Sequence, residues 1–200
     1  MSFAQLPKML TSETQGWSDI AERHPAANRL LFCLVMPMSL IPPVMYAYSE
    51  LANPGQVFPL SVPALSGFQL WISCFVLFAV QLAMVSFVAM LIQRMATAQD
   101  HDPGYEAAYS LAAIAPVPLW LSSLALFVPS LTFNVMVVAA AWVASVALIR
   151  HGVRPLLKVT DVQKSRYIAN MVTLAGVAAW FGLMIVSAAI LSMLLVSWSI

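Results

Sequence analysis

The chain contains five long apolar stretches without a charged side chain, and this feature limits its fold more than any other. These stretches are residues 30–49, 67–93, 107–128, 131–149 and 168–198. A helix needs about 20 mostly apolar residues to cross the hydrocarbon core of a bilayer. The sequence therefore predicts an all-α polytopic integral membrane protein, built as a bundle of five transmembrane helices.

The composition agrees with a membrane protein. Hydrophobic residues make up 62% of the 200 residues and charged residues only 8%, against roughly 45–50% and about 25% in soluble domains. Soluble, disordered and nucleic-acid-binding proteins all need exposed charge that this chain lacks. We therefore exclude these three classes, and with them a nucleic-acid partner.

The sequence divides into an N-terminal segment, residues 1–29, and a transmembrane domain, residues 30–200. In the first segment apolar residues recur at helical spacing. They are Phe3, Leu6, Met9, Leu10, Trp17 and Ile20. This pattern predicts an amphipathic interfacial helix on the cytoplasmic side, with its apolar face in the lipid headgroup boundary.

The positions of the cations predict the orientation of the chain. All nine Lys and Arg residues fall on one side of the membrane if the five spans alternate in direction. They are Lys8, Arg23, Arg29, Arg94, Arg150, Arg154, Lys158, Lys164 and Arg166. Cytoplasmic loops carry an excess of Lys and Arg. We therefore expect a cytoplasmic N-terminus and a C-terminus outside.

Proline is the most unusual component of the spans. Pro37, Pro42 and Pro43 lie in the first span, and Pro116 and Pro118 lie in the third. Each proline removes a backbone donor and leaves the carbonyl four residues earlier without its helical partner. One interpretation is that the broken helices line a solute cavity near the midplane. The other is that both helices are only kinked, with their carbonyls satisfied inside the protein.

The spans contain no Asp, Glu, Lys, Arg or His. Proton relays and ion pathways usually place such residues inside the membrane, so a proton-coupled pump is disfavoured, whereas a pore for a neutral solute stays open. Most polar side chains in or near the spans are expected to form hydrogen bonds between helices. They are Gln69, Gln81, Ser86, Asn134 and Asn170.

A basic segment, residues 150–166, connects the fourth and fifth spans. Arg150, Arg154 and Lys158 recur every four residues and would share one face of a helix, and Lys164 and Arg166 extend the charge. Contact with anionic headgroups would contribute on the order of 1 kcal/mol per cation. These residues could instead serve only to fix the orientation of the chain, and the two roles are compatible.

The motifs predict no catalytic, cofactor or metal site. Asp100, His101, Asp102 and Glu106 place three carboxylates and an imidazole within seven residues, but we interpret them as a solvated loop that caps the third helix. Cys33 and Cys74 lie in apolar runs and are interpreted as packing residues. Small residues at four-residue spacing in the fourth and fifth spans leave a homo-oligomer open.

Several short motifs point to a family. Gly104-Tyr105-Glu106 leads into Ala108-Tyr109-Ser110, Pro116 and Pro118 follow in the same helix, Pro129 lies at its outer turn, and Gly152-Val153-Arg154-Pro155-Leu156-Leu157 follows the fourth span. Together these resemble the Ypt-interacting protein (Yip) family, in its small bacterial inner-membrane members. The acidic DLYGP-type motif of many eukaryotic members is not found here, so no contact at that motif is carried over.

The resemblance implies five spans and a non-enzymatic protein of the bacterial inner membrane. Eukaryotic relatives bind prenylated Rab-type GTPases. We therefore expect a membrane scaffold or adaptor, whose partners are membrane lipids, including anionic headgroups, and an unidentified protein on the cytoplasmic side. The alternative is a small channel or transporter for a neutral solute, lined by the proline-broken first and third helices. A third hypothesis is a membrane enzyme that uses the loop from Asp100 to Glu106.

Overall fold

The computed structural model describes residues 9–10, 16–23, 25–54, 65–99 and 102–196, and the regular secondary structure of these residues is entirely helical. Five helical stretches are long and apolar enough to cross a membrane. They are Ala27–Ala52, Gly67–Thr97, Tyr105–Phe127, Leu131–Leu157 and Val162–Ile190. The predicted fold class, an all-α polytopic membrane protein, is confirmed.

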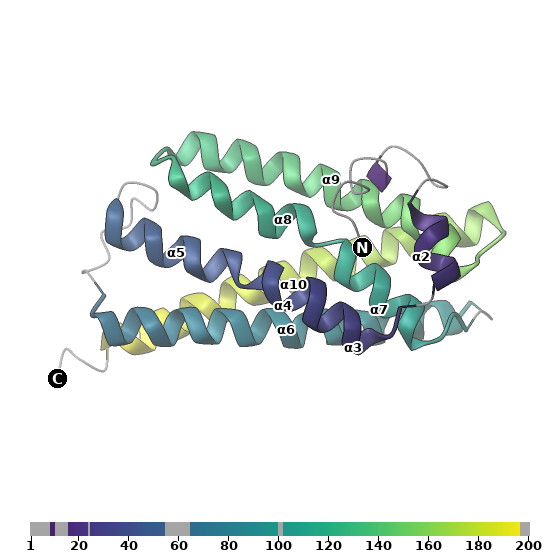
Figure 1. Cartoon of the computed structure of the whole chain (residues 1–200), viewed down its shortest axis with the longest axis horizontal. Helices are drawn as coiled ribbons and strands as arrows, with labels where there is room; N and C mark the ends of the chain where they lie inside the picture. The colour runs from purple at the N-terminus through teal and green to yellow at the C-terminus, as the bar shows by residue number, and fades with distance from the viewer. Residues whose placement is uncertain (1–8, 11–15, 24, 55–64, 100–101, 197–200) are drawn as a thin grey trace.

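The first and third spans consist of several short helical pieces, whereas the other three are single helices (Figure 1). The first span comprises α3 (Ala27–Leu30), the π-helical turn η2 (Leu31–Val35), α4 (Met36–Ser39) and α5 (Ile41–Ala52). The third comprises α7 (Tyr105–Ile114), α8 (Val117–Ser122) and the 3₁₀ turn η3 (Ser123–Phe127). The single helices are α6 (Gly67–Thr97), α9 (Leu131–Leu157) and α10 (Val162–Val196).

All three long single helices begin at side-chain caps. Ser130 precedes α9, and its hydroxyl accepts from the Phe133 backbone N–H at 3.4 Å. Ser66 precedes α6, where its hydroxyl accepts from the Gln69 backbone N–H at 3.3 Å while the Gln69 side chain accepts from the Ser66 N–H at 2.9 Å. Asp161 precedes α10, and its Oδ1 accepts from the Gln163 backbone N–H at 2.7 Å. Because each cap satisfies a backbone N–H that has no partner inside the helix, the helix start is fixed at these residues.

The helices of the fourth and fifth spans extend into the basic segment that was expected to connect them, residues 150–166. Helix α9 continues to Leu157 and α10 begins at Val162, so that only four residues connect them. The backbone hydrogen bonds of α9 continue after the apolar sequence ends, because a helix can extend from the membrane into water. Lys158 ends α9 with a φ of 54°, the left-handed conformation that commonly terminates helices.

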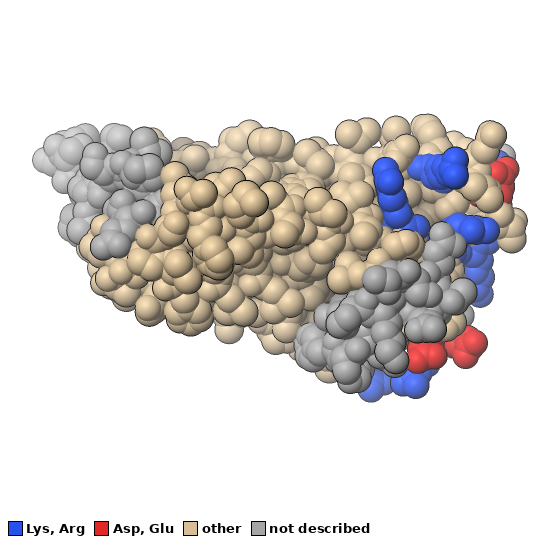
Figure 2. Space-filling model, turned by 90° about the horizontal axis from the view of Figure 1, so that it is seen from above, with Lys and Arg blue, Asp and Glu red and all other residues tan. Residues whose placement is uncertain are grey.

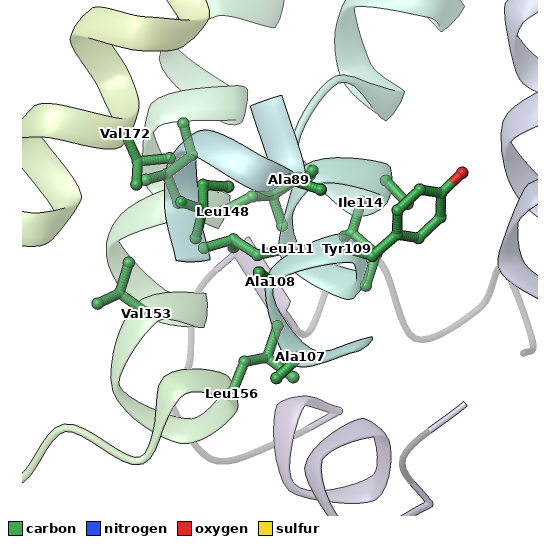
Figure 3. Close-up of a cluster of buried hydrophobic side chains, with 14 of the residues drawn as sticks. Ala89, Ala107, Ala108, Tyr109, Leu111, Ile114, Leu148, Val153, Leu156 and Val172 are labelled. Carbon is green, nitrogen blue, oxygen red and sulfur yellow. The ribbon is translucent and has the colours of Figure 1, made fainter. Parts of the chain in front are cut away.

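The tightest packing surrounds α7. This helix contacts α6 and α9, and its residues from Ala107 to Ile114 are all buried. Leu111 of α7, Leu148 of α9 and Val172 of α10 belong to one buried cluster (Figure 3). A helix that is apolar on every side is expected in the centre of a bundle. The alanines of α7 allow the neighbouring helices to approach it closely.

The N-terminal amphipathic helix is present as α2 (Trp17–Arg23), but its apolar face contacts protein. Trp17 and Ile20 are buried, and α2 packs against α9. The Trp17 Nε1–H donates to the Met9 carbonyl at 3.0 Å. The expectation that this face lies among lipid headgroups is therefore wrong for these residues. Phe3 and Leu6 lie outside the described residues.

The buried side chains of Gln81 and Asn134 form hydrogen bonds to backbone carbonyls that are close to them in the sequence. The Gln81 side-chain amide donates to the Leu77 carbonyl at 3.1 Å. The Asn134 amide donates to the carbonyls of Val128 and Ser130 at 2.9 and 2.8 Å. The prediction of a hydrogen bond between helices is wrong for Gln81, because a carbonyl one turn away lies within easier reach than a neighbouring helix. Asn134 bonds to Ser130, one turn back, and also to Val128, the last residue of the predicted third span.

Candidate functional site

All the described charged residues except Glu50 lie at one end of the bundle, which we call the charged end. Figure 2 shows the Lys, Arg, Asp and Glu side chains visible on one face gathered there. In the described part of the chain it carries Asp19, Glu22, Arg23, Arg29, Arg94, Asp102, Glu106, Arg150, Arg154, Lys158, Asp161, Lys164 and Arg166. Glu50, near the end of α5, lies at the opposite end, which we call the far end. The bundle therefore presents charge to one side.

The five basic residues singled out from the sequence all belong to the charged end. Arg150 and Arg154 lie on the last two turns of α9, Lys158 follows that helix, and Lys164 and Arg166 lie on the first turns of α10. Arg150, Lys158, Lys164 and Arg166 are exposed, whereas Arg154 is partly buried. Because α9 and α10 are joined by a short turn, the cations of both helices gather around that turn.

A small polar cavity of about 240 Å³ lies beside this turn. Lys158, Asp161 and Lys164 contribute to its wall together with Gln99. The Lys164 Nζ donates to the Gln99 carbonyl at 3.2 Å, which ties the start of α10 to the chain just after α6. The Asp161 carboxylate partly offsets the positive charge of the wall. The cations that remain exposed are available to anionic groups in water or on a membrane surface.

The acidic loop before the third span has a structural role. The Asp102 Oδ1 accepts from the Gly104 backbone N–H at 3.1 Å. Glu106 is exposed in the first turn of α7, where a negative charge complements the helix dipole. Asp100 and His101 lie outside the described residues. No group of three or more potential metal ligands exists among the residues that the structure describes.

The prolines mark the starts of new helical pieces. Pro37 is the second residue of α4, Pro42 and Pro43 are the second and third residues of α5, and Pro118 is the second residue of α8. Pro116 immediately precedes α8. The first turn of a helix tolerates proline, because its N–H groups have no partner within the helix.

A cavity of about 730 Å³ lies among the membrane-spanning helices, with walls contributed by α5, α6, α7, α8, α9 and α10. Pro42 and Pro116 line it, whereas Pro37, Pro43 and Pro118 do not. The structure thus brings one proline from each broken span to the same cavity. Much of the wall comes from the unbroken helices α6, α9 and α10.

The wall of this cavity is chiefly apolar. None of its lining residues is Asp, Glu, Lys, Arg or His. Trp142 of α9 and Trp180 of α10 both line it and meet edge to face, with ring centroids 5.7 Å apart. Ser145 also lines it, and its buried hydroxyl has no hydrogen-bond partner among the described residues. Such a wall suits an apolar molecule better than a hydrated one.

Sequence reasoning missed two features of this region. Gly176 of α10 lines the cavity, and a β-carbon built there meets no atom within 4 Å. Gly152 of α9 lies at the charged end, where it makes room for Trp17. A glycine inside a long helix is the signal that could have identified both positions. Glycine is less favourable than alanine in a helix interior, so its presence there draws attention to the surrounding packing.

Comparison with known proteins identifies one family. The family model described as the Yip1 domain matches residues 8–185, which includes most of the described chain. No curated protein and no solved structure matches the chain.

Proposed function

Because the chain belongs to the Yip1 domain family, we propose that it is a non-enzymatic membrane scaffold or adaptor that recognises its partners at the charged end. The distribution of charge carries this proposal. Exposed Arg150, Lys158, Lys164 and Arg166 lie at the same end as α2, whereas Glu50 is the single described charge at the far end. Protein recognition in water depends on such polar groups.

We place the charged end in the cytoplasm of a bacterium, at the inner membrane. The positive-inside tendency supports this orientation. The exposed cations would attract anionic lipid headgroups and hold the turn between α9 and α10 close to the membrane surface. A cytoplasmic protein would then bind to the same end of the bundle.

A channel or transporter for a neutral solute is less well supported. The cavity reaches Pro42 and Pro116, as that alternative requires. However, its wall is apolar, and Ile92, Ala112, Ile149 and Val172 at the end nearest the charged end are all buried. A hydrophilic solute would lose its hydration in such a cavity without gaining equivalent hydrogen bonds.

Isolation of the protein from membranes in a mild detergent tests the scaffold proposal. We expect the same protein partner in repeated isolations of the wild type, and its loss when Arg150, Lys158, Lys164 and Arg166 are all changed to Gln. The matched control is Glu50→Gln, which removes a charge at the far end and should leave the partner bound. Absence of any reproducible partner, or equal recovery with all three proteins, would contradict the proposal.

A further inference from the structure

We propose that the 730 Å³ cavity binds the acyl chain of a membrane phospholipid, which enters between α9 and α10. The volume lies in the range of about 300–1,000 Å³ that is typical of ligand sites. Protein interiors contain few voids larger than a water molecule, so a space of this size is not an ordinary packing defect.

The shape of the cavity favours a single chain. On α9 its wall runs from Leu131 to Ile149, which corresponds to about 27 Å along a helix. A volume of 730 Å³ spread along that length makes the cavity long and narrow, which is the shape of an extended hydrocarbon chain rather than of a compact ligand. A hydrocarbon chain therefore fits the cavity along its length.

The exposure of the lining residues locates the entrance. Leu131, Val135 and Ala139 on α9 are exposed, as is Met184 on α10. By contrast, Ile149 and Val172, which lie closer to the charged end on the same two helices, are buried. The cavity is thus closed toward the charged end and opens sideways, between α9 and α10, in the half of the bundle nearer the far end.

The surroundings of the entrance determine the chemistry of the occupant. The exposed lining residues Leu131, Val135 and Met184 lie within spans, where the adjoining solvent is lipid hydrocarbon. Water does not fill an apolar cavity in a stable way. An acyl chain from the leaflet at the far end can reach the opening without crossing a polar barrier, because its own tail already lies at that depth.

Two substitutions on α10 provide a matched test. Gly176 lines the cavity, and its β-carbon position is open, so Gly176→Phe places a ring inside the cavity. Ala178 is exposed and does not line the cavity. The control Ala178→Phe adds the same ring to the outer surface of the same helix.

The readout is native mass spectrometry of the full chain in detergent, titrated with dioleoyl phosphatidylcholine. This lipid has no net charge, which separates the cavity from anionic headgroup binding at the charged end. We expect one tightly retained lipid on the wild type and on Ala178→Phe, and binding weaker by about tenfold or more on Gly176→Phe. Equal lipid retention by all three proteins would overturn the proposal.

A second measurement keeps the test valid if Gly176→Phe folds poorly. Ala139→Phe narrows the opening from the α9 side. In a background in which the exposed Trp71 is replaced by Phe, the fluorescence of the lining residues Trp120, Trp142 and Trp180 reports on the interior. Phospholipids brominated along the acyl chain should quench the wild type more strongly than Ala139→Phe. Unchanged quenching would overturn the proposal, as would a protein that forms a dimer through this face and retains no lipid.

Discussion

The indole ring of Trp17 lies against Gly152, so closely that a β-carbon at position 152 would stand 2.7 Å from the Cη2 atom of the ring. Leu111 approaches the same point to 2.8 Å. This contact attaches α2 to α9 at the charged end. The N-terminal helix is therefore part of the packed bundle, and the absence of a side chain at position 152 makes this packing possible.

We expect Gly152→Ala to destabilise the protein by about 1–3 kcal/mol, because the rigid indole has to move. The matched control is Gly176→Ala, where a β-carbon meets no atom within 4 Å. That change should stabilise the helix by up to about 1 kcal/mol, because alanine is the better helix former. Thermal unfolding in detergent measures both effects, and limited proteolysis tests whether α2 is released. Equal stability of the two variants would contradict this prediction, because it would show that a methyl group at position 152 meets no steric cost from Trp17.

We expect Ser145→Ala to be neutral or slightly stabilising, because the hydroxyl has no hydrogen-bond partner among the described residues and its removal leaves no other group unpaired. Asn134→Ala should cost about 1–2 kcal/mol, since the Asn134 amide donates to two carbonyls. Thermal unfolding compares the two variants. A larger loss for Ser145→Ala, or a loss of lipid binding, would indicate that a bound molecule uses this hydroxyl.

The sequence was sufficient to predict the spans, because hydropathy reports directly on the hydrocarbon core. It was less informative about the ends of the helices. Arg150 and Arg154 end the apolar run of the fourth span, yet α9 continues beyond them to Leu157, since backbone hydrogen bonds do not depend on hydropathy. The spacing of Trp17 and Ile20 likewise indicated an apolar helix face, but an apolar face packs equally well against lipid or protein.

The cavity was harder to predict from sequence. The prolines indicated where the first and third spans break, and Pro42 and Pro116 do line the cavity. The cavity itself, however, is a property of tertiary packing, because its wall combines several helices. Residues far apart in the sequence, such as Trp142 and Trp180, both contribute to it.

The exposed cations should select anionic lipids. We expect the variant with Gln at positions 150, 158, 164 and 166 to lose much of its preference for anionic over zwitterionic phospholipid, because each cation near the surface contributes about 1 kcal/mol. Quantification of the lipids retained in nanodiscs at low salt measures this preference. The difference should shrink as salt is raised. An unchanged preference would contradict lipid selection and would leave these residues only the role of fixing the orientation of the chain in the membrane.

The proposed orientation predicts the accessibility of single cysteines. In a background in which the two free cysteines, Cys33 and Cys74, are replaced by Ala, Lys158→Cys and Pro129→Cys place a thiol at the charged end and at the far end. In sealed right-side-out membrane vesicles, a membrane-impermeant maleimide should label position 129 and leave position 158 unlabelled until detergent is added. The reverse pattern would invert the assignment.

Photo-crosslinking in intact membranes tests the central claim, recognition at the charged end, most directly. A photoreactive amino acid replaces Lys158 at the charged end in one protein and Leu51, an exposed residue near the far end, in another. The proposal predicts a reproducible protein adduct from position 158 and none from position 51. Adducts from position 51 alone, or the absence of any adduct from position 158, would contradict it.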